Sequence, residues 1–174
     1  VHWPEVMVSL EESEGILFAA DAFGKFGALC HKEDWACEAR RYYFNICGKY
    51  GVQVQALLKK LAGANSQTIC PRHGPILTEN LGYYIGLYDT WSKYEPETEG
   101  VFVAYASIHG GTGVAAHKLA EMLTAAGAPK VAITDLSRCD LAEAVEDAFR
   151  YSSMVLCAAS YDAGVFPPMA DFLH

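Results

Sequence analysis

Residues 101–126 constrain the fold most strongly. They read as an apolar run, VFVAYA, followed by a loop of small and hydroxylated residues and then by an amphipathic helix expected over 112–126. The order of strand and helix repeats at 130–135 and 140–151, and a further strand at 153–158 precedes a helix that begins near Pro167. Regular β–α alternation predicts a parallel sheet with right-handed crossovers.

Ligands of parallel sheets bind beyond the carboxyl ends of the strands. We therefore expect the loops 107–113 and 159–164 to converge on one site. The first loop carries the pattern Ser-x-x-Gly-x-Thr at Ser107, Gly110 and Thr112. Backbone N–H groups of such a loop, together with the positive end of the following helix, can bind a phosphate.

The pattern of the loop also indicates which class of phosphate compound it binds. This loop has neither the Gly-x-Gly-x-x-Gly pattern of dinucleotide sites nor the Gly-Lys-Ser/Thr of a P-loop. Two hydroxyl groups and a glycine suit one terminal phosphate rather than a pyrophosphate, which indicates a mononucleotide such as FMN. A plain turn of small residues between a strand and a helix is the alternative interpretation.

The part of the chain before residue 100 follows a different pattern. The polar, acidic segment 95–100 contains Pro and Gly and is the best candidate for a linker between two parts. Before it we expect strands at 5–9, 16–20 and 68–70, helical structure over 33–62 with a break at Gly48 and Gly51, and an aromatic-rich helix over 77–94.

Metal ligands are candidates in this first part. His2, Asp21 and His73 each lie at an expected strand end or tight turn, where a strand can fix the direction of a ligand. Imidazoles with a carboxylate suit zinc, iron or manganese. Taken singly, an Asp after a strand can be a cap and a His before Gly can be a turn residue. His31 opens an expected helix and is predicted to be solvated.

Composition excludes several classes of function. With 174 residues, 52% hydrophobic and 20% charged, the chain can build a core. The net charge of −8 argues against nucleic acid and anionic membranes as partners. We find no apolar run of membrane-spanning length and no visible signal peptide. The six cysteines include no Cys-x-x-Cys pair, so we expect free thiols in a reducing cytoplasm rather than disulfides.

Taken together, the segments resemble the A-type flavoproteins, also called flavodiiron proteins. Residues 2–5, 17–24 and 71–75 are similar to three ligand-bearing segments of that family's metallo-β-lactamase-like domain. Two further segments are similar to the FMN loops of its flavodoxin-like domain. Their residues are Ser107, Ile108, His109, Gly110, Gly111 and Thr112 in one loop, and Ala159, Ser160, Tyr161, Asp162, Ala163 and Gly164 in the other.

The resemblance implies an α/β chain with a partial metallo-β-lactamase-like αββα domain over 1–97 and a partial flavodoxin-like doubly wound domain over 98–174. It implies a non-haem di-iron centre in which Asp21 is the bridging carboxylate and His2 and His73 are terminal ligands. The family's other ligands come from an upstream His-x-Glu-x-Asp-His segment that is not found here. We therefore expect the middle of a longer protein.

The resemblance also implies an activity and partners. FMN would pass electrons to the iron centre, which would reduce dioxygen to water or nitric oxide to nitrous oxide. The implied electron donor is a partner such as rubredoxin, a flavin reductase or a reduced deazaflavin. The implied assembly is a head-to-tail homodimer or tetramer. An FMN electron-transfer module with a degenerate metal site and a zinc hydrolase are the alternatives.

Overall fold

The computed structural model describes residues 6–30 and 34–174. Contacts divide the chain into two compact units, Val1–Glu95 and Pro96–His174. The assignment of residues 1–97 and 98–174 to two named domains stays a prediction. Over the part of the chain that the structure describes, no helix combines the length and the apolar character that a membrane span requires.

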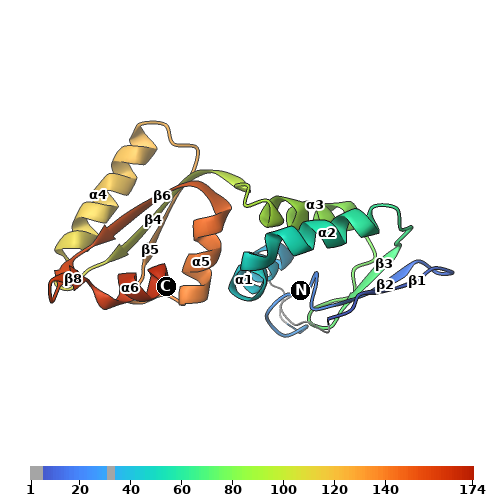
Figure 1. Ribbon diagram of the computed structural model, residues 1–174. Coiled ribbons are helices and arrows are strands. Elements are labelled where there is room, and N and C mark those ends of the chain that lie inside the picture. The colour runs from blue at the N-terminus through green and yellow to red at the C-terminus, as the bar shows by residue number, and fades with distance from the viewer. Residues whose placement is uncertain (1–5, 31–33) are drawn as a thin grey trace. The chain divides into compact units, whose positions relative to one another are not determined.

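The first unit combines a small sheet with helices (Figure 1). Its elements are β1 Ser9–Glu11, β2 Ile16–Ala20, α1 Trp35–Ile46, the 3-10 helix η1 Gly48–Tyr50, α2 Gly51–Leu61, β3 Thr68–Pro71 and α3 Leu81–Ser92. The strand order is β1-β2-β3, with β1 antiparallel to β2 and β2 parallel to β3. Aromatic rings from the helices form its core, with Tyr43 and Trp91 almost fully buried.

Several boundaries in this unit differ from the sequence prediction. The first strand lies at Ser9–Glu11 rather than at 5–9, because it pairs with β2 across a tight hairpin. The helix predicted over 77–94 begins only at Leu81, since Leu77 exchanges two backbone hydrogen bonds with Ile69. The break expected near Gly48 and Gly51 is present as the 3-10 helix between α1 and α2.

The second unit is a parallel sheet with helices on both faces (Figure 1). Its elements are β4 Thr98–Ala106, α4 Gly111–Ala125, β5 Val131–Asp135, α5 Leu141–Arg150, β6 Tyr151–Ala158, β7 Ser160–Tyr161, β8 Gly164–Val165 and α6 Pro167–Leu173. The strand order is β5-β4-β6, so the first strand of the unit, β4, lies between the second strand, β5, and the third, β6. A flavodoxin-like sheet begins with the same order. The predicted fold class is confirmed.

Side chains on β4 alternate between two faces, as expected for a central strand. Phe102, Ala104 and Ala106 are fully buried in one cluster with Ala144 of α5 and Met169 of α6. Residues 98–100, predicted as part of the linker, instead begin β4. Gly100 is required there, because a Cβ would lie 2.6 Å from the carbonyl oxygen of Lys130.

Candidate functional site

Asp21 and His73 lie side by side in the first unit. Asp21 directly follows β2 and His73 follows β3, and these strands are parallel neighbours whose carboxyl ends meet. The backbone N–H of Arg72 donates to the carbonyl of Ala20 at 2.7 Å. One carboxylate oxygen of Asp21, Oδ1, lies 3.6 Å from His73 Nε2 and 4.0 Å from Arg72 Nη1. Two of the three predicted ligands are therefore together.

The two ligand-bearing turns fit closely against each other. The N–H of Lys25 donates to the carbonyl of His73 at 3.3 Å. A Cβ on Gly24 would lie 3.0 Å from the carbonyl oxygen of His73, and a Cβ on Gly74 would lie 3.0 Å from Cγ of Lys25. Gly74 also has φ +96°, which favours glycine. Both glycines are needed for the close approach of the turns.

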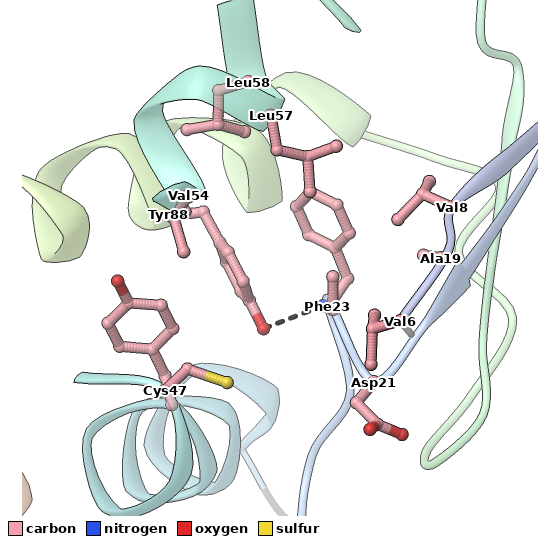
Figure 2. A pocket seen from close by; sticks show the side chains of 12 residues that line it. Val6, Val8, Ala19, Asp21, Phe23, Cys47, Val54, Leu57, Leu58 and Tyr88 are labelled. Atoms are coloured by element: carbon pink, nitrogen blue, oxygen red, sulfur yellow. Dashed lines mark hydrogen bonds between the residues drawn. The ribbon is translucent and has the colours of Figure 1, made fainter. Parts of the chain in front are cut away.

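The turn that carries Asp21 has unusual backbone angles. Ala20 has φ 51° and Phe23 has φ 62°, in the left-handed region that non-glycine residues rarely adopt. The buried N–H of Phe23 donates to Oη of Tyr88 at 2.7 Å (Figure 2). Asp21 itself is largely buried, with 12% of its side chain exposed, whereas His73 is about half exposed.

An apolar cavity of about 30 Å³ adjoins Asp21 (Figure 2). Burial raises the pKa of the Cys47 thiol to about 11, and it raises the pKa of the Tyr43 hydroxyl well above its ordinary value. The thiol of Cys47 and the hydroxyl of Tyr43 are therefore uncharged at neutral pH. The cavity's lining is formed by Val6, Val8, Ala19, Asp21, Ala22, Phe23, Tyr43, Cys47, Val54, Leu57, Leu58 and Tyr88.

The third predicted ligand, His2, lies outside the described residues, as does His31. Within residues 6–30 and 34–174, no group of three or more His, Cys, Asp or Glu side chains is arranged to hold a metal ion. Asp21 and His73 thus supply a carboxylate and an imidazole, which are suitable donors for iron, zinc or manganese, but they supply only part of a coordination sphere.

The two loops predicted to bind flavin begin side by side. They follow β4 and β6, which are parallel neighbours with Ala106 opposite Ala158, and the N–H of Ala159 donates to the carbonyl of Ala106 at 3.2 Å. The sequence predicts a loop for the second segment. It is a hairpin instead, in which β7 pairs with β8 and Asp162 and Ala163 form a left-handed turn with φ of 46° and 58°.

The first loop fits an anion. The hydroxyl oxygen of Ser107, Oγ, is buried and has no hydrogen-bond partner within the described residues. Gly110 has φ +87°, and a Cβ on Gly110 or Gly111 would meet no atom within 4 Å. The helix α4 starts at Gly111 without a side-chain cap. Uncapped N–H groups and a buried hydroxyl in an open loop are the donors that a phosphate requires.

A larger polar pocket of about 470 Å³ opens beside this loop toward the end of β5. Its floor includes Tyr105, whose pKa is raised by burial and by the nearby carboxylate of Asp135. His117 of α4 contacts the Tyr105 ring edge-on, and Arg138 pairs with Asp135 at 3.6 Å. The sequence reasoning did not include these residues, although Asp135 ends a parallel strand and the strand-end rule could have identified it.

No family model matches the chain, whereas curated proteins and solved structures resemble it. The chain is 30% identical over 189 residues to a coenzyme F420H2 oxidase of Methanothermobacter marburgensis, an alignment covering 99% of the chain and 45% of the oxidase. It is 23% identical over 185 residues to the anaerobic nitric oxide reductase flavorubredoxin of Escherichia coli, covering 100% of the chain and 38% of that protein.

A solved structure supports the same fold. The flavodiiron protein from Giardia intestinalis superimposes with a TM-score of 0.90 at 21% identity, over 99% of the chain and 44% of that protein. The fold therefore joins part of a metallo-β-lactamase-like domain to part of a flavodoxin-like domain. In sequence and in fold, the chain is similar to part of the flavodiiron proteins and their relatives. It spans less than half the length of these relatives.

Proposed function

We propose that the chain is part of a flavodiiron oxidoreductase that reduces dioxygen to water or nitric oxide to nitrous oxide. The observation that carries this proposal is the pairing of Asp21 with His73 at the joined ends of β2 and β3. In the complete protein, Asp21, His73 and His2 would hold iron with ligands from outside this chain. A di-iron centre, when bound, supplies a place where dioxygen or nitric oxide is reduced by several electrons.

The residues around Asp21 suit a small, uncharged substrate. The adjoining cavity is apolar and its tyrosine and cysteine side chains are neutral at physiological pH. An apolar wall excludes water from one side of the Asp21 carboxylate and favours a diatomic gas over an ionic substrate. The relative named as a nitric oxide reductase supports nitric oxide as one substrate.

The second unit is proposed to hold FMN as the electron source. Ser107 and Thr112, with the N–H groups at the start of α4, would bind its phosphate, and the hairpin 159–164 would border its ring system. We assign residues 1–97 to the iron-binding domain and residues 98–174 to the flavin-binding domain. Rubredoxin, a flavin reductase or a reduced deazaflavin would reduce the flavin in the cytoplasm; the flavorubredoxin relative supports a rubredoxin-type donor.

Iron analysis of the full-length protein tests the proposal. Asp21→Ala should lose iron and keep FMN, because Asp21 is a ligand in one unit and the flavin loop lies in the other. Asp89→Asn, which removes an exposed carboxylate of the same unit, is the matched control and should keep both cofactors. Loss of flavin together with iron in Asp21→Ala would indicate unfolding. A flavin-bound wild type without iron would favour the electron-transfer module instead.

The proposed assembly is at least a homodimer. Electron transfer over a long gap is slow, and pairing head to tail would let the flavin of one subunit serve the iron of its partner. Such an interface should bury more than about 1,000 Å². Sedimentation of the full-length protein checks this. A monomer at micromolar concentration that still reduces dioxygen at full rate would contradict it.

A further inference from the structure

The turn that carries Asp21 needs an external support. Two residues in this turn, Ala20 and Phe23, are in the left-handed region, at φ 51° and 62°. This conformation is unfavourable for residues other than glycine, and an aromatic residue in it is rare. Such a conformation persists only where the surrounding structure holds it.

Tyr88 supplies that support from α3, 65 residues away along the chain. Its hydroxyl oxygen accepts the Phe23 N–H at 2.7 Å, and its ring packs on the Phe23 ring with centroids 4.4 Å apart. Tyr88 is 4% exposed and Phe23 is 1% exposed, so water does not replace this bond. Figure 2 shows the Tyr88 hydroxyl pointing at the backbone of the turn.

The bond is coupled to Asp21 through a short, closed turn. The N–H of Ala22 donates to the carbonyl of Ala19 at 3.0 Å, and the N–H of Gly24 donates to the carbonyl of Asp21 at 3.3 Å. A rotation at Phe23 would therefore move Gly24 and the carbonyl of Asp21 with it. Gly24 packs closely on the carbonyl of His73, where an added Cβ would lie 3.0 Å from the oxygen, so a movement of the turn would also disturb the segment that carries His73.

We propose that Tyr88 is a positioning residue for the metal centre: its hydroxyl fixes the left-handed backbone at Phe23 and thereby aims the Asp21 carboxylate at the space beside His73. This inference rests on the proposed function, since it assigns Tyr88 to the same divalent first-row metal site. Tyr88 is not a ligand. It acts through the backbone, as groups outside the coordination sphere commonly do when they orient a ligand.

A neighbouring tyrosine provides a matched control. Tyr43 is fully buried, its ring centroid lies 5.2 Å from that of Tyr88, and its hydroxyl makes no hydrogen bond with any residue the structure describes. Tyr88→Phe and Tyr43→Phe therefore each delete one buried oxygen atom from the same aromatic cluster. Only the first deletes the bond to the turn.

The experiment uses the full-length protein, stripped of metal and titrated with Co²⁺, whose visible absorption reports the geometry of its ligands. Tyr88→Phe should bind Co²⁺ roughly 10- to 100-fold more weakly, the usual effect of losing a group that orients a ligand, with an altered spectrum. Tyr43→Phe should keep the wild-type affinity and spectrum. Wild-type affinity and spectrum in Tyr88→Phe, or equal losses in both variants, would overturn the inference.

A second measurement separates this inference from the proposed function. A crystal structure of metal-free Tyr88→Phe should show Phe23 outside the left-handed region and Asp21 turned from His73, whereas an unchanged φ at Phe23 would overturn the positioning role whatever metal binds. A wild-type protein that binds FMN but takes up no Co²⁺ would overturn the proposed function. In that case the φ angle of Phe23 in the crystal structure of Tyr88→Phe would still test whether Tyr88 holds the turn.

Discussion

Ser107→Ala should have opposite effects on the flavin-free protein and on its affinity for flavin. In the structure, Ser107 Oγ is buried and lacks a hydrogen-bond partner within the described residues. A buried hydroxyl without a partner costs about 1–3 kcal/mol, so its removal should leave the flavin-free protein unchanged or more stable by about 1 kcal/mol. In a protein of 150–250 residues, about 1 kcal/mol corresponds to a rise in Tm of roughly 2–4 °C, and the rise should be smaller in the longer full-length protein.

The same substitution should weaken flavin binding. If Ser107 donates to the phosphate of FMN, the lost charge-assisted hydrogen bond is worth about 1.5–3 kcal/mol, which corresponds to a roughly 10- to 150-fold higher Kd. Thr112→Val should weaken binding in the same range, for the same reason. Flavin fluorescence quenching on titration of the flavin-free, full-length protein gives the Kd, and thermal unfolding of that protein gives the stability.

Ser152→Ala is the control for this experiment. Ser152 Oγ accepts the N–H of Gly100 at 3.1 Å and lies at the opposite end of β6 from the flavin loop. Its removal should lower stability and leave the Kd for FMN unchanged. The reasoning about Ser107 would be refuted if Ser107→Ala bound FMN as tightly as the wild type, or if it destabilised the flavin-free protein as Ser152→Ala does.

Three further predictions concern the first unit. Gly51→Ala should destabilise the protein by about 1–3 kcal/mol in urea unfolding, because the added Cβ would lie 2.4 Å from the carbonyl oxygen of Ser92. A Cβ on Gly86 would meet no atom within 4 Å, so Gly86→Ala should stabilise α3 by up to about 1 kcal/mol. Equal effects of the two substitutions on stability would contradict the packing at Gly51. Cys47, with a pKa of about 11, should resist iodoacetamide at pH 8 in the native protein while exposed Cys30 reacts, as mass spectrometry can measure. Because the folded state favours the neutral Cys47 thiol, its contribution to stability is present below about pH 9 and should be lost as the pH rises toward about 11.

The convergence of strand ends could be predicted from the sequence because it follows from local patterns. Apolar runs that end in small or polar residues locate the carboxyl ends of β2, β3, β4 and β6. Parallel pairing then brings the following residues together, as it does for Asp21 with His73 and for Ser107 with Ala159. Asp140 stands directly before α5, in the position where a helix cap is typical, and it accepts the N–H of Ala142 at 2.9 Å.

The starts of helices and strands that depend on backbone pairing with another segment could not be predicted. Residues 77–80 have a helical pattern, yet Leu77 pairs with Ile69, eight residues earlier, and delays the start of α3. Residues 98–100 have the composition of a linker, yet Thr98 pairs with Tyr151 in the register of β6. In both cases pairing with another backbone segment decides the structure, and the composition of the segment itself carries no signal of that partner.

Residues with left-handed backbone are a feature of the proposed metal site that the local sequence pattern does not predict. Tyr94 follows the C-terminus of α3, and Asp162 with Ala163 forms the turn of a two-residue hairpin, which are ordinary uses of this conformation. Asn80, the N-cap of α3, is a residue type that tolerates it. The remaining pair, Ala20 and Phe23, brackets Asp21, and neither residue type favours such a backbone. The strain thus falls on both sides of the residue that the sequence singled out for its chemistry, and a tyrosine from a different element bonds to the strained backbone at Phe23. Since strained backbone is kept where geometry matters for function, this coincidence is an argument for the Asp21 site that is independent of any likeness to other proteins.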